Sequence, residues 1–584
     1  MSVELLITEH LDLWTRVVKS KSAGGRARNG EVETTGIKKL RELILELAVR
    51  GKLVAQHDSD EPAQTLLKRI TEKKARLQAD GQIKKTKELP AVSEDEARFD
   101  IPSNWIWTRL GTIAQISPRN RAEDQTEVSF IPMPLITTSH TGGHSQEKRQ
   151  WSAIKKGYTH FADGDIALAK ITPCFENSKA AVFRNLHNGI GAGTTELHVA
   201  RPYGSTIDPF FILYCLKSPG FLIRGEARMT GTAGQKRLPK DFFATDPIPL
   251  PPLAEQHRIV QKVDELMALC DRLEQQTRDQ HAAHETLVDA LLDTLTQSQD
   301  ADELADNWAR LAAHFDTLFT SEQSVERLKR SVIQLAISGR LTNQAGNTEP
   351  PAVLLDAIAE QRESLVQLNK IRKPAQSRRS SKSAELFSLP KGWQWGVLED
   401  LFAIVTDGDH QAPPKSASGI PFLTIGNVNT GSINFHGCRH VPSEYYESLD
   451  WARRPGKNDL LYTVTGSYGI SAPVTSHKAF CVQRHIAILK SVDATPIPYV
   501  LLFLRSQLAF DYVERSVTGI AQKTLSLSAL RKMPIPIPPL EEQERLVKQS
   551  DKLMMLCDQI KAHVKQAGES RRQMAEAVVE QAIH

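Results

Sequence analysis

The feature that most constrains the fold is a long internal repeat, because the chain contains nearly the same sequence twice. The stretch "PPLAEQHRIVQKVDELMALCDRLE" begins at Pro251, and "PPLEEQERLVKQSDKLMMLCDQIK" begins at Pro538. Earlier stretches also return about 288 residues later: 40–56 as 328–344, 61–70 as 349–358, and 99–110 as 387–398. Self-similarity at a fixed period indicates a duplicated unit. The 584 residues therefore predict two related halves rather than a single core.

The repeat keeps its flanks but not its interior. "SPRNRAEDQTEVSFIPMPLITTSHTGGH" in the first copy has no visible counterpart in "TDGDHQAPPKSASGIPFLTIGNVNTGSI" in the second. Drift alone would erode all parts similarly, so we infer that the flanks share one role and that the interiors, here called the bodies, have two. The predicted regions are 1–98 (N-terminal helical region and linker), 99–251 (first body), 252–345 (central helical, coiled-coil region), 346–386 (linker), 387–539 (second body) and 540–584 (C-terminal helix).

The flanks are predicted to be helical. In the helix that follows the first body, here called a trailing helix, apolar residues recur at spacings of four and three from Ile259 to Leu273, as in a heptad seam. The second trailing helix repeats this seam with one polar break, at Ser550. The leading helices, which precede the bodies, are predicted to end at Gly51 and Gly339, because glycine is the common residue at a helix C-cap.

Two helix arrangements fit this pattern. Each of the four helices could pack on its own body, or each trailing helix could pair antiparallel with the leading helix of the other copy. The heptad seam favours the second arrangement, which closes the repeat with pseudo-twofold symmetry. The bodies are predicted to be mixed α/β: 164–172 and 458–466 are typical of strands, whereas 208–228 and 495–515 are typical of buried helices.

Composition excludes several classes of protein. Hydrophobic residues make up 40% of the chain and charged residues 24%, with a formal charge of +4, so no polybasic tail is expected. The six cysteines contain no CxxC pair, which argues against a zinc site or a disulfide framework. The N-terminus carries acids where a signal peptide needs basic residues, and no run of about 20 apolar residues predicts a membrane span. We therefore expect a cytoplasmic protein.

A search for catalytic motifs finds none. The sequence has no GxxxxGK[ST] loop for a nucleotide, no HExxH metal motif and no N-P-P-[YF] stretch. The glycine-rich "NGIGAGTTE" (188–196) could be mistaken for a cofactor loop. Because "ELHVARP" follows it and is typical of a strand, we expect a loop between two strands instead. Binding is therefore the predicted role.

The candidate binding residues lie in loops that mix amide, hydroxyl and basic side chains. Two loops correspond: "TGTAGQKRLPK" (230–240) and "VTGIAQKTLS" (517–526) each precede a proline-rich exit. Glutamine can contact adenine edges, and Lys or Arg can contact guanine or phosphate. For any single residue, an exposed or turn-forming role is the alternative. The candidates are Arg119, Arg121, Lys170, Thr172, Lys179, Gln235, Lys236 and Arg237 in the first body, and His410, Gln411, Asn427, Asn429, Ser467, Tyr468, Gln483, Arg484, Gln522 and Lys523 in the second.

These motifs resemble a known family. Two variable bodies, entered at "IPSNWIW" and "LPKGWQW" and followed by "PIPLPPLAEQHRIVQKVDEL" and "PIPIPPLEEQERLVKQSDKL", are similar to the specificity (S) subunits of type I restriction-modification enzymes. The resemblance implies an α+β fold, with two mixed α/β target-recognition domains separated by long antiparallel coiled-coil helices. It also implies that each domain binds one half of a split double-stranded DNA site.

The resemblance further implies partners and cofactors. Two modification subunits would dock on the helices through residues such as Ile259, Val263, Leu266, Leu546 and Leu553, and restriction subunits would join them. S-adenosylmethionine, ATP and Mg²⁺ would then belong to those subunits, so that this chain has no cofactor, no metal and no catalytic residue. One alternative is a non-catalytic helical scaffold with two protein-binding domains. Another is a self-sufficient DNA methyltransferase or nuclease, for which the catalytic motifs are missing.

Overall fold

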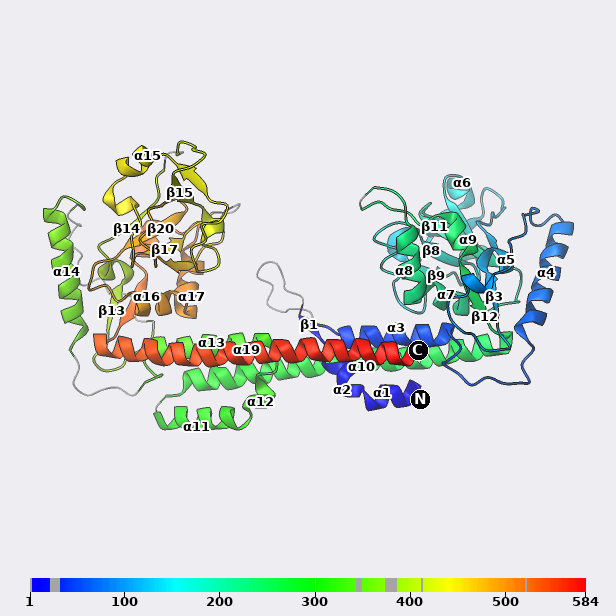
Figure 1. Ribbon diagram of the computed structural model, residues 1–584, viewed down its shortest axis with the longest axis horizontal. Helices are drawn as coiled ribbons and strands as arrows, with labels where there is room; N and C mark the ends of the chain where they lie inside the picture. Colours follow the sequence, from blue (N-terminus) through cyan, green and yellow to red (C-terminus); the bar gives the residue numbers. More distant parts are fainter. Residues whose placement is uncertain are drawn as a thin grey trace. The chain divides into compact units, whose positions relative to one another are not determined.

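A computed structural model describes residues 3–20, 32–232, 234–299, 301–342, 349–372, 386–410, 413–519 and 522–583. The chain forms two compact units (Figure 1): unit 1 contains 1–281 and 567–584, and unit 2 contains 282–566. Among the described residues, no helix is both long and apolar enough to cross a membrane. The polar segments 21–31 and 373–385, which belong to predicted linkers, and Gln411 lie outside the described residues.

The helical frame of unit 1 combines three segments that are far apart in the sequence. They are α3 (Thr35–Val49), the N-terminal part of α10 (Leu253–Gln297) and the C-terminal end of α19 (Leu540–Ile583). Leu40 and Ile44 of α3, Ile259 of α10 and Ala575 of α19 belong to one buried apolar cluster. Arg41 of α3 also forms ion pairs with Asp271 (2.6 Å) and Glu274 (2.7 Å) of α10.

Unit 2 repeats this frame with the roles of the two long helices exchanged. Here α13 (Glu322–Ile337) packs on the N-terminal part of α19 and on the C-terminal part of α10. Leu328 of α13, Leu292 of α10 and Cys557 of α19 share one apolar cluster. Helices α11 (Ala301–Ala313) and α12 (Phe315–Leu318) complete it through Leu311 and Leu318.

The predicted pairing with the leading helix of the other copy therefore occurs along only part of each trailing helix. The first half of each trailing helix packs on the leading helix of its own copy, and the second half packs on the leading helix of the other copy. The helix α10 has 45 residues, longer than the seam recognised in the sequence. The leading helices end as predicted, because Gly51 and Gly339 have φ angles of 70° and 71°, which favour glycine at a C-cap.

Shorter elements precede each body. Unit 1 begins with α1 (Val3–Glu9), α2 (Leu11–Arg16) and the strand pair β1 (Lys19–Ser20) and β2 (Val32–Glu33). Helix α4 (Ala63–Ala79) precedes the first body, and α14 (Pro351–Gln367) precedes the second. The predicted linker 346–386 thus contains a helix of 17 residues.

The first body contains two four-stranded sheets. One has the order β6-β5-β10-β7, and the other β4-β11-β8-β9. The second sheet packs on α7 through β8 and β9, and both α7 and α8 contact α3 of the frame. The two helices predicted as one over 208–228 are separated at Ser218, which caps α8. The elements are β3 (Ile106–Arg109), α5 (Leu110–Ile113), β4 (Ala114–Ile116), β5 (Glu127–Ile131), β6 (Glu147–Gln150), α6 (Trp151–Ile154), β7 (Thr159–Ala162), β8 (Ile166–Ala169), β9 (Ala180–Val182), β10 (Ile190–Gly193), β11 (Leu197–Pro202), α7 (Pro209–Lys217), α8 (Pro219–Arg228), α9 (Lys240–Thr245) and β12 (Pro247–Leu250).

The second body repeats this plan with one strand fewer among the described residues. Its sheets have the orders β14-β20-β17-β18 and β16-β15-β19, and α16 and α17 contact α13. The elements are β13 (Gln394–Val397), β14 (Ile404–Asp407), β15 (Ile420–Leu423), β16 (Arg439–Val441), α15 (Ser443–Ser448), β17 (Leu460–Thr463), β18 (Ser471–Pro473), β19 (Cys481–Val482), β20 (Ile486–Lys490), α16 (Ile497–Leu504), α17 (Gln507–Ser516), α18 (Leu527–Arg531) and β21 (Pro534–Ile537).

The tryptophan-containing and proline-rich stretches that flank each body pair with one another. Strand β3 pairs antiparallel with β12, and Trp107 lies opposite Pro249. In the second copy β13 pairs with β21, and Trp395 lies opposite Pro536. The first and last strands of each body thus form one ribbon, which explains why both stretches recur in the sequence.

The glycine-rich stretch 188–196 is a packing feature. The sequence predicts a loop here, but Ile190–Gly193 form strand β10 in the centre of a sheet. A Cβ atom on Gly193 would lie 2.2 Å from the carbonyl oxygen of Ile131, and one on Gly191 would lie 2.5 Å from the ring of Phe161. The glycines therefore permit close approach of a neighbouring strand. The strand predicted directly after this stretch is present as β11.

Candidate nucleic-acid interface

The loop with the sequence Gln-Lys in the first body docks on the end of β8. The backbone N–H of Thr172 donates to the carbonyl of Lys236 at 3.0 Å, and that of Leu238 donates to Lys170 at 2.7 Å. On the other side, the N–H of Lys170 donates to the carbonyl of Glu196 at 2.9 Å. Three segments, around residues 171, 196 and 237, therefore meet at one junction.

The second body forms the same junction at the end of β17. The N–H of Gly466 donates to the carbonyl of Lys523 at 3.1 Å, and that of Leu525 donates to Val464 at 2.8 Å. The N–H of Val464 donates to the carbonyl of His485 at 3.1 Å. Each hydrogen bond has its counterpart in the first body. The two bodies thus hold corresponding loops on the same backbone scaffold.

Each Gln-Lys loop is closed by a small hairpin. In the first body Thr230 and Arg237 exchange two backbone hydrogen bonds of 3.0 and 2.7 Å. In the second, Thr518 and Thr524 exchange bonds of 3.0 and 2.8 Å. The second hairpin is one residue shorter than the first, yet it closes in the same way. Backbone hydrogen bonds therefore close both hairpins in the same way, although the loops differ in length.

At the first junction, Gln235, Lys236 and Arg237 are exposed. The guanidinium of Arg237 binds both carboxylate oxygens of Glu196, with N···O distances of 2.8 to 3.2 Å. The hydrogen bonds from Arg237 lower the pKa of the Glu196 carboxyl. The hydroxyl of Thr172 accepts from the backbone N–H of Lys236 at 3.1 Å. Thr172 therefore supports the loop, while Gln235 and Lys236 face solvent.

At the second junction, Gln522 and Lys523 are likewise exposed. The ammonium of Lys523 lies 3.7 Å from the carboxylate of Glu514, which accepts a hydrogen bond from the hydroxyl of Tyr468 at 2.6 Å. Tyr468 was predicted to contact DNA, but its ring is buried in the core of the body and cannot do so. Tyr468 instead orients Glu514 beside Lys523.

Three further predicted residues of the second body gather near this junction. The Gln483 amide lies 3.2 Å from Nδ1 of His485, and Nε of exposed Arg484 lies 3.3 Å from Nε2 of the same ring. Ser467 is exposed directly after Gly466. His485 corresponds to Glu196 of the first body, so the same backbone position carries an imidazole in one body and a carboxylate in the other.

Other predicted residues of the first body lie away from the junction. Arg119 and Arg121 are exposed in the segment between β4 and β5, where Arg119 reaches the carbonyl of Tyr158 at 3.5 Å. The Lys179 ammonium donates to the carbonyl of Met133 at 3.0 Å. Lys179 thus ties two segments of the body together, whereas both arginines keep exposed side chains.

In the second body, Asn427 has a structural role. Its carboxamide oxygen accepts from the N–H and the hydroxyl of Thr424, and its NH₂ group donates to the carbonyl of Asn434. Asn429 is exposed. His410 is also exposed and lies 3.1 Å from the carboxylate of Asp407. Asn427 therefore stabilises its own turn, and its contact with DNA stays a prediction.

The comparisons with known proteins agree with the duplicated architecture. Residues 102–280 and 390–567 both match the model of the type I restriction modification DNA specificity domain. The chain belongs to this family. Each matched region comprises one body and the first part of the trailing helix that follows it.

Individual relatives align along the whole chain. The chain is 42% identical over 595 residues to the type I restriction enzyme EcoAI specificity subunit of Escherichia coli, covering 100% of both chains. It is also 42% identical over 601 residues to the EcoEI specificity subunit of Escherichia coli, again covering 100% of both. A solved chain from a study of complex assembly and conformational transition of the type I R-M system is 18% identical, covers 83% of this chain and 99% of that chain, and has a TM-score of 0.47.

The residues of the heptad seams were predicted to dock partner subunits, but they pack inside the chain instead. Ile259, Val263 and Leu266 are buried in the core of unit 1, and Leu546 is buried in unit 2. Leu553 is half-buried against the helices of unit 2. A buried seam cannot also contact another subunit without opening the frame. The seam pattern in the sequence therefore reflected packing within the chain.

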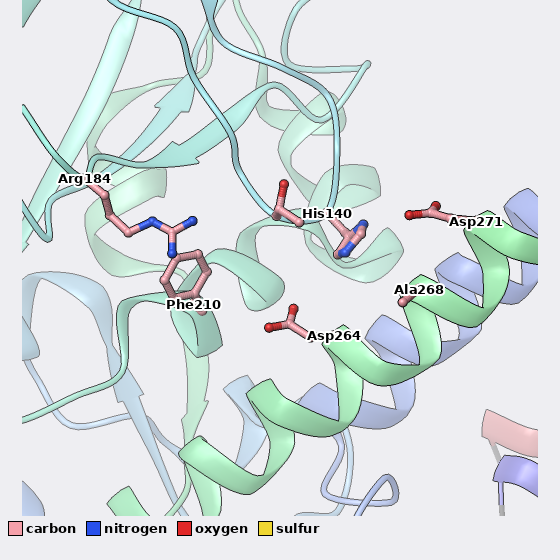
Figure 2. A pocket seen from close by; sticks show the side chains of 7 residues that line it. His140, Arg184, Phe210, Asp264, Ala268 and Asp271 are labelled. Atoms are coloured by element: carbon pink, nitrogen blue, oxygen red, sulfur yellow. The ribbon is translucent and has the colours of Figure 1, made fainter.

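A cavity of about 300 Å³ lies between the first body and α10 (Figure 2). Asp264 and Asp271 of α10 line it together with His140, Arg184 and Phe210. The Arg184 guanidinium stacks on the ring of Phe210 at 4.5 Å, and burial lowers the pKa of His140. Two carboxylates make the cavity unsuited to a phosphate group. Among the described residues, no group of three or more His, Cys, Asp or Glu side chains could hold a metal ion.

Sequence reasoning missed several residues that shape the junction. Glu196 and His485 carry no motif, and each stands between two short strands. His198 was also missed: its Nε2–H donates to the carbonyl of Leu238 at 2.8 Å and supports the Gln-Lys loop from beneath. Burial lowers the pKa of His198 to about 4. Only the folded chain reveals these partners, because they lie about 40 residues apart.

Proposed function

We propose that the chain confers DNA sequence specificity on a type I restriction-modification complex, with each body binding one half of a split site. The observation that carries this proposal is the duplicated junction. Its backbone is the same in both bodies, whereas Arg237 and Glu196 of the first body are replaced by Thr524 and His485 in the second. One scaffold with two sets of side chains suits two different half-sites.

The charge of the bodies supports contact with DNA. The first body has 17 Lys and Arg residues against 13 Asp and Glu, and the second has 14 against 11. Lysine and arginine contribute to DNA affinity by neutralising phosphates, and base contacts add specificity. Exposed Lys236, Lys523 and Arg484 stand at the junctions, where such contacts would be made.

We assign no catalytic role to the chain. Methyl transfer would belong to two modification subunits that bind S-adenosylmethionine, and translocation and cleavage to restriction subunits that use ATP and Mg²⁺. The support is the family membership together with the lack of cofactor motifs in the sequence. Within the complex, this chain would select the site.

The docking surfaces for modification subunits should lie on exposed faces of the long helices. In unit 2, the apolar residues Met555 and Leu556 of α19 are 64% and 47% exposed. Unpaired apolar side chains on a helix are suited to contact with another chain. This surface replaces the buried seam residues as the proposed docking site in unit 2.

Mapping of methylated sites tests the function directly. DNA from cells that contain this chain and its modification partner would be sequenced by a method that detects methylated bases. We expect one split motif, methylated on both strands and lost when this chain is deleted. Exchanging residues 99–251 for those of a relative should change one half of the motif and leave the other unchanged.

The same experiment distinguishes the scaffold alternative. With an active modification partner, a scaffold would leave the methylated motif unaltered when the chain is deleted or when one body is exchanged. A change in both halves after exchange of residues 99–251 would contradict the assignment of one body to each half-site.

A further inference from the structure

The residues Gln-Lys are identical in the corresponding loops of two bodies that diverge in most of their sequence. They are Gln235 and Lys236 in the first body, and Gln522 and Lys523 in the second. The carbonyls of both lysines accept the equivalent hydrogen bond, at 3.0 Å from Thr172 and 3.1 Å from Gly466. The pair keeps this place although the second hairpin is one residue shorter.

Several side chains around the pair differ between the two bodies. Position 170 is Lys in the first body, and its counterpart 464 is a buried Val; Thr172 corresponds to Gly466. The ion pair of Arg237 and Glu196 is replaced by Thr524 and His485. The junction therefore combines a constant pair with a variable surround.

Constant and variable positions suit the two kinds of DNA contact. Phosphates are the same in every sequence, so contacts to them position a protein without specifying bases, whereas contacts to base edges must change when the site changes. We infer that Gln235–Lys236 and Gln522–Lys523 are phosphate-binding anchors, one for each half-site. This inference rests on the proposed function and identifies the ligand as the DNA backbone.

The local geometry suits a phosphodiester. Backbone hydrogen bonds hold each lysine in place from the end of a buried strand, so little main-chain freedom is lost on binding. The amide of glutamine and the ammonium of lysine both donate to phosphate oxygens. The ammonium of Lys523 lies 3.7 Å from the carboxylate of Glu514, but ion pairs between exposed side chains are weak, so this pair exchanges readily for phosphate.

The test uses the complete chain assembled with its modification subunits. The variants are Lys236→Ala, Lys523→Ala and both together, with Lys68→Ala on α4 as a control that removes the same charge outside the bodies. Affinity is measured on duplexes with the mapped site and with a scrambled site, across a series of salt concentrations. Methylated motifs are mapped for every variant.

We expect each junction variant to lose about tenfold in affinity on both duplexes and to keep its motif unchanged. Log K falls with log salt, and each variant should make this slope shallower by about 0.9. The double variant should make it shallower by about twice as much. Lys68→Ala should leave the slope unchanged.

A motif that relaxes at one base in one half, with an unchanged salt slope, would overturn the inference and make the pair a base-reading element. An unchanged affinity on both duplexes would also overturn it. If the unaltered chain directed no methylation motif, the proposed function itself would fail, and this result is distinguishable because it appears before any substitution.

Discussion

In unit 1 the indole N–H of Trp105 donates to Glu255 at 2.9 Å, whereas the buried indole N–H of Trp393, its counterpart in unit 2, has no acceptor among the described residues. The carboxylate equivalent to Glu255 is Glu542, and it pairs instead with Arg545 at 3.0 Å and with Thr342. The frame thus keeps its backbone and its apolar seams in both units, but the polar partners are arranged separately in each.

The two bodies, whose sequences mostly differ, nevertheless share one polar contact. An ion pair between one strand and the residue before its neighbour is retained, as Arg201 with Asp165 at 2.7 Å in the first body and Lys490 with Asp459 at 2.6 Å in the second. Around it, loop residues differ almost completely. The two copies therefore share the contacts that hold the fold and differ in most of their loop residues, and each position has a natural control in the other copy.

The largest expected difference concerns Leu266 and its counterpart Leu553. Leu266 is only 4% exposed in the core of unit 1, whereas Leu553 is half-buried. A carboxylate in place of Leu266 would lose the apolar contacts and bury a charge, so Leu266→Asp should cost more than about 4 kcal/mol. Leu553→Asp should cost about half as much, because its carboxylate can reach water. Thermal unfolding of the full chain measures both.

Glu265→Ala serves as the control, since Glu265 is the exposed neighbour of Leu266 on α10. It should shift the unfolding temperature little. Equal losses for Leu266→Asp and Leu553→Asp would mean that the two seams are packed alike, contrary to the burial of these side chains.

A second difference is the pH dependence that His198 adds to the first body. Its counterpart in β20 is Ala487, which does not titrate. Burial lowers the pKa of His198 from 6.5 to about 4, so the unfolded chain takes up the proton first as the pH falls. Stability contributed by neutral His198 is complete above pH 6.5 and is lost between pH 6.5 and about 4, by about 3 kcal/mol in all.

The measurement is denaturant unfolding of the full chain at several pH values, compared with His198→Phe. The variant should show a shallower decline between pH 6.5 and 4, by the equivalent of one proton. Burial also lowers the pKa of His144 and His160, so part of the slope should remain. Identical slopes for both proteins would show that folding does not lower the pKa of His198.

The sequence predicted those features that depend on spacing along one segment. Gly51 and Gly339 could be assigned as caps because helices often end at a residue that tolerates positive φ, and the heptad seams could be recognised from their period. Strands β8 and β17 lie within the short apolar runs 164–172 and 458–466 that predicted them, although both strands are shorter than those runs. The fold class and the duplicated architecture were therefore accessible.

Features that depend on distant segments were not accessible. Nothing in the local pattern shows that the ring of Tyr468 is buried while its hydroxyl orients Glu514, or that Asn427 is engaged by its own turn. The pairing of Arg237 with Glu196 joins residues 41 positions apart. The seam residues illustrate the same limit, because a periodic apolar stripe does not specify whether its partner is the same chain or another.

The smallest effect concerns the polar break in the second seam. Ser550 is 1% exposed and its hydroxyl has no hydrogen-bond partner among the described residues, whereas its counterpart Val263 is fully buried in an apolar cluster. Removing an unsatisfied buried hydroxyl relieves a desolvation cost, and alanine is also the better helix former. Ser550→Ala should therefore stabilise unit 2 by about 1 kcal/mol, measured as a raised unfolding temperature.

Val263→Ser is the reciprocal change. It should destabilise unit 1 by about 2 kcal/mol, because it replaces the two buried methyl groups of valine with an unsatisfied hydroxyl. If the two seams differ in this way, the two substitutions should change the stability of their units in opposite directions. A loss of stability in Ser550→Ala would instead mean that the hydroxyl bonds to the carbonyl one turn earlier, at Leu546, as serine can within a helix. In that case the break in the seam is a satisfied polar contact, and the two frames are closer in energy than their sequences indicate.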